Sequence, residues 1–356
     1  MGSTLDDAID LFTRQDNLYA APLADYVADL TLEVPIELSP SPYIPIWKIT
    51  AITNALPLLK SLTLDGLRLR FRQHNHPVIP RPLDRLCLYK ILADADASHV
   101  VRTLVSTYSM RALDISGIRF EGLVGPSAAP TAAPSCVHSL ALRSHVSTAP
   151  LLAIFATGAL RNLDVSCTSA SDGQAFGALV TVTGAALETL SLDLAEYAAR
   201  VDFATEEHLQ PLLLDKCRAL HALTLRVTFL SEPWASLPHN ATALRILAHV
   251  IASAPQTLRS LTIAIALDGP VTFEAAFLRP FERALGEQLA GLEYTLMEKR
   301  DLATVRWVWE RARKRALNEA LYRRVGQDLT ALVKARFPVL EETGGLSFGS
   351  DIEDEM

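Results

Sequence analysis

The sequence predicts an α/β fold: a leucine-rich-repeat solenoid (horseshoe) of about ten irregular repeats, with parallel strands on its concave face and helices and loops on its convex face. Two observations lead to this prediction. Leucine makes up 58 of the 356 residues, well above ordinary usage. Apolar anchors also recur in a fixed order: one anchor, two variable residues, a second anchor, one variable residue and a third anchor. Leucine-rich repeats have this spacing and a period of about 20–29 residues.

The spacing recurs along most of the chain. Between the second anchors Leu30 and Leu292 the mean interval is about 29 residues, which leaves room for a helix in each repeat. We therefore expect one strand at each copy. The copies begin at Val27, Leu59, Leu83, Met110, Val137, Leu160, Leu187, Leu220, Leu258 and, in the weakest copy, Leu289.

One face of each predicted strand is polar. Side chains two residues apart on a strand share a face, so the second and third anchors are buried and the residue between them is exposed. A doubly wound or barrel fold, whose parallel strands are buried on both faces, is disfavoured. Only residues 261–267, which are apolar except for Thr262, look like such a strand. The residues between the anchors are Thr31, Thr63, Cys87, Asp114, Ala141, Asp164, Ser191, Thr224, Thr262 and Glu293.

Helical patterns occupy several of the intervals between strands. We expect helices over residues 93–108, after a cap at Ser147 or Thr148, over 205–213, after Thr242, and after Thr272. Two connections are expected to contain no helix, namely residues 70–82 and the Gly- and Pro-containing stretch 120–135.

The chain divides into three parts on this pattern. Residues 1–26 are the expected N-terminal cap, 27–300 the repeat array, and 301–356 a basic, amphipathic helical C-terminal cap with a short acidic tail. Residues 299–336 contain 11 Lys and Arg against 4 Asp and Glu, a net charge of +7 in a chain of −7. Two interpretations remain open: a solvated helix face, or a docking surface for an acidic partner or for this protein's own acidic body.

No sequence motif predicts catalysis. Dinucleotide, phosphate-loop, serine-hydrolase, zinc-protease and EF-hand motifs are all missing, so we expect a protein that is not an enzyme and has no cofactor. The alternative from another class is an unrecognised enzyme whose site is assembled across repeats. His74 and His76 have no third ligand nearby, and no metal site is expected. Asp114 and Asp164 recur in the same strand position, which the repeat itself explains.

Composition and cysteine spacing indicate an intracellular protein, cytoplasmic or nuclear. No run of 18 apolar residues is present, and the first residues lack the basic and apolar regions of a secretory signal. The cysteines, at positions 87, 136, 167 and 217, form no paired motif and are expected to be reduced. We expect no membrane partner and, since the net charge is −7, no nucleic-acid partner.

The sheet face is the default binding surface, because solenoids present extended concave surfaces. Its flanking positions are rich in arginine and poor in aromatic residues, a composition that favours a polar or acidic protein partner. The candidate partner-binding residues are Lys60, Arg85, Tyr89, Lys90, Arg111, Arg143, Arg161, Arg226 and Arg259.

Three stretches resemble fungal leucine-rich-repeat proteins of the F-box-like type. They are Leu23–Glu33 (LADYVADLTLE), Leu56–Gly66 (LPLLKSLTLDG) and Arg336–Glu341 (RFPVLE). The resemblance implies a non-enzymatic interaction module, or the substrate-recognition part of an SCF-type ubiquitin ligase, in which an F-box docks the ligase adaptor. The first 40 residues hold no Leu-Pro-x-Glu-led F-box, so adaptor binding is expected only if an F-box lies upstream.

Overall fold

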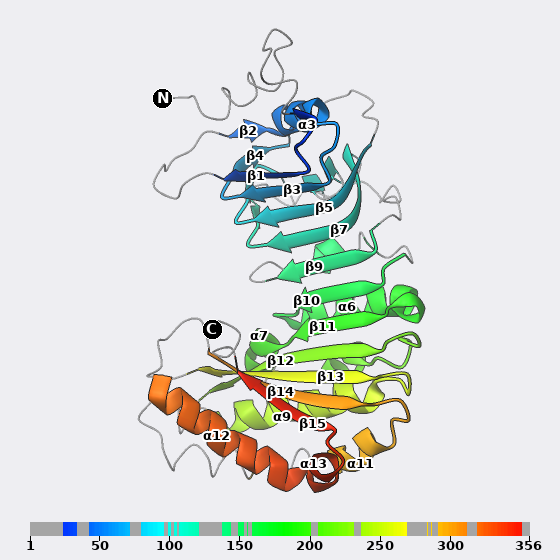
Figure 1. The fold of residues 1–356 in the computed structure, drawn as a ribbon, viewed down its shortest axis with the longest axis vertical. Helices are drawn as coiled ribbons and strands as arrows, with labels where there is room; N and C mark the ends of the chain where they lie inside the picture. The colour runs from blue at the N-terminus through cyan, green and yellow to red at the C-terminus, as the bar shows by residue number, and fades with distance from the viewer. Residues whose placement is uncertain are drawn as a thin grey trace. The chain divides into compact units, whose positions relative to one another are not determined.

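A computed structural model describes residues 24–33, 43–71, 80–95, 99–100, 103–104, 107–120, 137–143, 149–152, 155, 159–200, 206–230, 236–268, 283, 286, 291–311 and 319–350. The chain forms two compact units. The first comprises Met1–Val146 with Ala153–Leu160, and the second Ser147–Leu152 with Arg161–Met356. The described parts of both units contain helices and strands. Eleven strands belong to the longer parallel sheets, five in the first unit and six in the second (Figure 1).

The first unit contains two parallel sheets. Its longer strands pair in chain order, and a second sheet of short strands alternates with them along the chain. One helix, α3 (Ile46–Ala55), follows the first short strand. The longer strands are β1 (Asp29–Glu33), β3 (Ser61–Asp65), β5 (Arg81–Tyr89), β7 (Tyr108–Ser116) and β9 (Ser139–Arg143); the short ones are β2 (Ile44–Pro45), β4 (Arg68–Arg70), β6 (Leu92–Ala93) and β8 (Arg119–Phe120).

The corner between a long and a short strand has the same conformation three times. Gly66, Lys90 and Gly117 each follow a long strand, and their φ angles are 68°, 51° and 68°. Glycine reaches this left-handed region without a Cβ penalty, whereas lysine adopts it at a cost. The amides of Gly66 and Lys90 donate to the last residue of the next long strand, at 2.9 Å in both cases. The corners thus link each repeat to the next.

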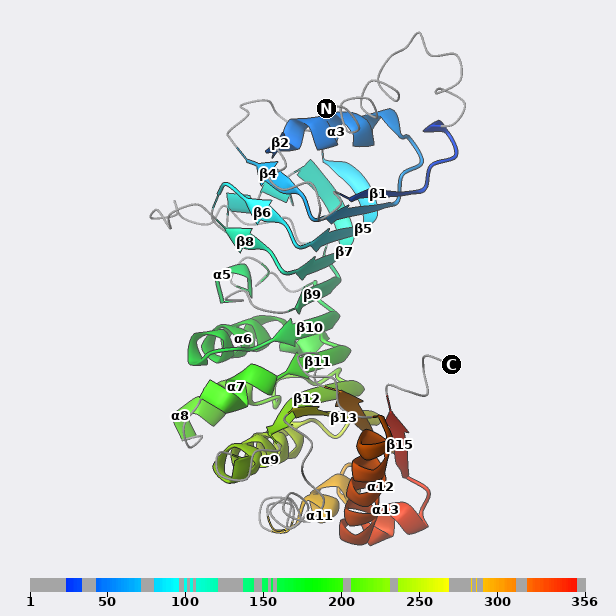
Figure 2. The same cartoon turned by 90° about the vertical axis from the view of Figure 1, so that its left-hand side faces the viewer.

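The second unit contains one parallel sheet whose strands also pair in chain order. Helices α6, α7 and α9 lie along one face of its first strands (Figure 2). The strands are β10 (Asn162–Ser166), β11 (Thr189–Asp193), β12 (Ala222–Leu230), β13 (Ser260–Asp268), β14 (Thr304–Arg311) and β15 (Leu346–Ser350); the helices are α5 (Ala149–Leu152), α6 (Ala170–Thr183), α7 (Ala195–Arg200), α8 (Glu206–Leu209), α9 (Ser236–Ser253), α11 (Leu292–Met297), α12 (Glu319–Arg336) and α13 (Pro338–Glu342), with 3-10 turns η2 (Gly184–Ala186) and η3 (Gln210–Leu212).

The predicted anchors align from strand to strand within each unit. Leu62 lies opposite Leu86, and Leu190 opposite Leu223. All four are at most 2% exposed, so each sheet has one apolar face. The residues between the anchors are also in register and form the other face, which we call the outer face.

The residue after the first anchor carries a recurring backbone hydrogen bond. The Lys60 carbonyl accepts the amides of Asp84 and Arg85 from the next turn, at 2.7 and 3.1 Å. This shared acceptor shifts the strand by one residue, which explains why anchors three apart point to the same side before the alternation begins. The same arrangement involves the carbonyls of Ala28, Arg161, Glu188, His221 and Arg259.

Nine of the ten predicted copies are strands, and the tenth is not. Residues 289–294 were expected to supply a strand, but Leu292 begins helix α11. The next strand is β14, inside the segment from residue 301 that was expected to be helical, so the helical prediction is wrong there. Val305 and Trp309 fit a helical period, but Trp307 between them is buried with both, which is a strand's alternation.

The other helix predictions are confirmed at least in part where the residues are described. Helices α5 and α8 lie in predicted intervals, α9 covers the interval after Thr242 but begins earlier, at Ser236, and α12 confirms the helical part of the C-terminal segment. In the 93–108 interval, Val100 and Leu104 are helical and buried. The helix expected after Thr272, His74 with His76, and nearly all of the N-terminal cap lie outside the described residues.

Candidate functional site

The side chains on the outer face are small and polar, both in the sheet of longer strands of the first unit and in the sheet of the second unit. Thr63, Cys87 and Asp114 lie side by side across β3, β5 and β7. Ser191, Thr224 and Thr262 do so across β11, β12 and β13. Strand β13 is the exception, since Ala264 and Ala266 are buried on this face, as its apolar run predicted. The outer face therefore offers hydroxyl groups and charges rather than an apolar surface.

In the first unit, two predicted binding residues are paired with an acid on this face. The Tyr89 hydroxyl donates to Asp114 Oδ2 at 2.9 Å, and Arg85 Nη2 lies 3.4 Å from the same oxygen. Asp114 is 5% exposed, and Cys87 beside it is 3% exposed. Burial, followed by the hydrogen bonds to Cys87 and Asp114, raises the pKa of Tyr89. Tyr89 and Arg85 are therefore both paired with Asp114 within the protein.

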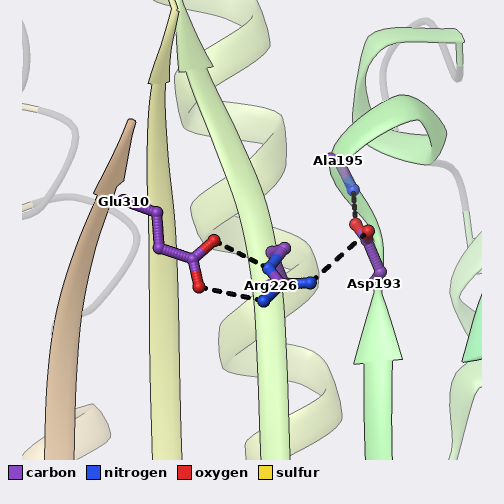
Figure 3. Close-up of polar contacts among 4 residues, drawn as sticks. All are labelled: Asp193, Ala195, Arg226 and Glu310. Atoms are coloured by element: carbon purple, nitrogen blue, oxygen red, sulfur yellow. Dashed lines mark hydrogen bonds and ion pairs between the residues drawn. The ribbon is translucent and has the colours of Figure 1, made fainter. Parts of the chain in front are cut away.

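In the second unit, Arg226 is held within the protein. Its Nε and Nη2 donate to the two carboxylate oxygens of Glu310 at 2.8 and 2.9 Å, and Nη1 lies 4.0 Å from Asp193 (Figure 3). Glu310 is two strands away, and Arg226 reaches it across β13, where the buried Ala264 and Ala266 leave room. The guanidinium of Arg226, a predicted partner-binding residue, thus ties β12 to β14 and β11 and remains 42% exposed.

The pKa values of Arg226 and Asp193 are both raised, which favours the charged form of the arginine and disfavours that of the aspartate. Burial would lower the pKa of Arg226, but the hydrogen bond and charge of Glu310, aided by Asp193 and Asp164, raise it. Burial raises the pKa of Asp193, although the Ala195 amide, which donates to its Oδ1 at 3.0 Å, and Arg226 act against that rise. Asp193 thus carries a desolvation cost that its partners offset incompletely.

The remaining predicted residues flank the strands. Lys60, Arg111, Arg161 and Arg259 occupy the position after the first anchor in four different turns, and all are exposed. Arg161 pairs with Glu188 at 3.0 Å. Arg143 lies exposed at the end of β9, and Lys90 Nζ is 4.0 Å from Asp65. The structure therefore brings the predicted residues together only in groups within each unit.

A groove of about 670 Å³ lies at the start of the strands of the first unit. Two predicted residues, Lys60 and Arg111, line it, and Arg81, Asp84 and His138 join them. Its apolar lining comes from Pro57, Leu58, Leu59, Pro82, Leu83 and Met110, with Ser109 beside them.

The sequence pattern did not identify three of the titratable residues of this groove, namely Arg81, Asp84 and His138. The predicted surface was chosen from basic residues beside the anchors, which omitted the acidic Asp84 and the weakly basic His138 even though both occupy the same repeat position as Lys60. That shared position was the available signal. Arg81 precedes the first anchor of its repeat, so the spacing carries no information about it.

The described residues show no assembled metal or thiol chemistry. They contain no cluster of three or more potential metal ligands. Cys87, Cys167 and Cys217 are buried and form no disulfide, and burial raises the pKa of Cys217 to about 12. Among the helices described, none has both the length and the apolar character needed to cross a bilayer. Compared with models of known protein families and with characterised proteins, the sequence matches none.

Proposed function

We propose that the chain is a leucine-rich-repeat solenoid that acts as a non-enzymatic module for binding another protein. The observation that carries this proposal is the recurrence of one hydrogen-bonding arrangement: the residue after the first anchor accepts two amides from the next turn, in turn after turn. A solenoid is defined by repeats that contact only their neighbours and that share one core.

The distribution of side chains supports a binding role. Most apolar anchors are buried in the core of their unit, and the outer face carries small hydroxyl-bearing residues with scattered charges. Solenoids use such extended faces to bind macromolecules. Basic residues at the strand starts give this surface cations in a chain whose net charge is −7, which favours an acidic partner.

Affinity purification with the full chain, followed by titration of each purified candidate, tests the proposal. We expect at least one protein to bind with a Kd of roughly micromolar or tighter. The triple variant R111E/R143E/R161E should weaken that binding. The charge-matched control K216E/R218E/R245E, whose residues are exposed but lie outside the strand faces and strand starts, should not.

Two outcomes would count against this function or narrow it. If no candidate binds the purified wild-type chain in titration, the interaction role fails. Saturable binding of the purified F-box adaptor of a cullin ligase would instead assign the chain to substrate recognition in such a ligase, the role that the family resemblance implies.

A further inference from the structure

We infer that the groove at the start of β3, β5 and β7 binds an extended acidic segment of a partner protein. This inference rests on the proposed function, because it specifies where such a module binds and which chemistry it recognises. The groove lies wholly within the first unit, and its volume of about 670 Å³ suits a few residues of peptide rather than a folded surface.

The groove is a positively charged place in a negatively charged chain. Its lining includes Lys60, Arg81 and Arg111 against one acid, Asp84, a net charge of +2 with His138 neutral. Lys60 and Arg111 are exposed, and among the described residues neither has an ion pair. Cations without a partner attract carboxylates, and complementary charge speeds and orients association.

Arg81 is incompletely compensated. Its Nη2 donates to the Leu56 carbonyl, and its buried Nε has no acceptor among the described residues. Burial lowers the pKa of Arg81, which means that its charged form lacks the stabilisation it has in water. A carboxylate bound beside this guanidinium would supply the missing negative charge.

The groove also has an apolar component, which separates a peptide from a small anion. Leu58 is 56% exposed, although most leucines of this chain's repeats are buried. Pro57 and Pro82 lie with it along the lining and are exposed as well. Together they offer a contact for an apolar side chain of the ligand, which a free phosphate or carboxylate ion does not have.

The strand register predicts the spacing of charges in the ligand. Lys60, Asp84 and Arg111 precede the paired residues Ser61, Arg85 and Ala112, so they form one row across three neighbouring strands. Adjacent strands are about 4.8 Å apart, which places the backbones of Lys60 and Arg111 about 10 Å apart. Three residues of peptide in the extended polyproline II conformation span about this distance, and residues three positions apart then share a face. Asp84 repels an acid placed between them. The expected ligand therefore has two acidic residues three positions apart, with uncharged or apolar residues at the two positions between.

Selection of a random peptide library on the full-length protein tests the inference. We expect the recovered peptides to be enriched in Asp or Glu at this spacing, with uncharged or apolar residues at the two positions between. A synthetic peptide of the selected sequence should bind K60E/R111E about tenfold more weakly than wild type, measured by fluorescence polarisation. Raising the salt concentration should weaken binding to the wild type.

Matched variants separate this groove from general electrostatics. K216E/R218E makes the same double charge change at exposed residues of the second unit, outside the strand faces and strand starts, and should leave affinity unchanged. D84N should tighten binding and allow an acid at the positions between the two acidic residues. If K60E/R111E loses its circular dichroism signature, K60Q/R111Q replaces it, with a smaller expected loss.

Several outcomes would overturn the inference. These are the recovery of no peptides, recovery of peptides without acidic enrichment, or equal affinity for wild type and K60E/R111E. A peptide of residues 351–356 (DIEDEM) can be tested for its ability to displace the selected peptide from the groove. If it does so as effectively as an unlabelled copy of the selected peptide, the groove is assigned to this chain's own acidic tail instead of a partner. A partner protein that still binds K60E/R111E fully would leave the proposed function standing and remove only the groove.

Discussion

Arg226, Glu310 and Asp193 illustrate how single residues on the outer face are used. A bidentate guanidinium–carboxylate pair is a directional, charge-assisted contact, and here it joins strands that are not neighbours. Its location on a partly exposed face limits its contribution to stability, because solvent screens such pairs. For function, this means that Arg226 is already paired with a carboxylate of its own chain. Lys60 and Arg111 have no such ion pair among the described residues.

Replacing Asp193 with Asn should change how stability depends on pH. Burial raises the pKa of Asp193, so the folded state holds this proton more tightly than the unfolded state. Stability from this group is therefore lost as pH rises from the ordinary carboxyl pKa through the raised one. We expect D193N to gain stability relative to wild type over that range, because Asn keeps an oxygen for the Ala195 amide and carries no charge.

Urea unfolding at a series of pH values from 4 to 8 measures this difference. D215N is the control, since Asp215 is exposed and pairs only with neighbouring Lys216 in the described residues. A stability difference between D193N and wild type that stays constant with pH would show that burial of Asp193 does not affect folding.

At the scale of elements, helix α6 shows how a helix is specified. Ser169 caps its first turn by accepting the Asp172 amide at 3.3 Å, and Asp172 returns the contact by accepting from Thr168 and Ser169. Asp172 is fully buried, and these donors satisfy its carboxylate. The cap therefore both starts the helix and allows an acid to be buried.

Two helical glycines should respond to alanine with opposite signs. A Cβ at Gly177 in α6 would lie 2.7 Å from the Pro211 carbonyl oxygen in η3, so G177A should destabilise the fold by about 1–2 kcal/mol despite alanine's higher helix propensity. A Cβ at Gly326 in α12 meets only Trp309 at 3.6 Å, and G326A should stabilise by about 0.5–1 kcal/mol. Chemical denaturation of both variants checks this, and a loss of similar size in both would contradict the close approach of α6 to η3.

At the scale of the whole molecule, the repeat arrangement predicts that damage stays local. Leu86 is fully buried in the first unit, and Leu86→Ala should cost about 2–5 kcal/mol. If each turn depends mainly on its neighbours, amide protection should fall in β3, β5 and β7 and remain in β13 and β14. Hydrogen exchange followed by mass spectrometry measures this, with T63A on the outer face as the control. Equal loss of protection in both units would contradict nearest-neighbour behaviour.

The strands that sequence predicted correctly share a physical cause. A spacing with two buried anchors is a local pattern, and it identified the nine long-sheet strands from β1 to β13, because each of these strands from β3 onward buries its own apolar anchors. It failed at β14, where tryptophans replace leucines and fit two periods at once, and it missed β15. The short strands β2, β4, β6 and β8 were also missed, because two or three residues are too few to show a period.

By itself, the sequence determined the positions of nine long-sheet strands, the polar outer face and the basic residues at the strand starts, since each follows from the order of residues along one turn. Only the tertiary structure decided which of those charges are available. Arg226 is occupied by Glu310, 84 residues away, whereas Lys60 and Arg111 are brought to one groove with Arg81. Partnership between residues of different turns depends on strand register and side-chain reach, and neither is encoded in the spacing of a single repeat.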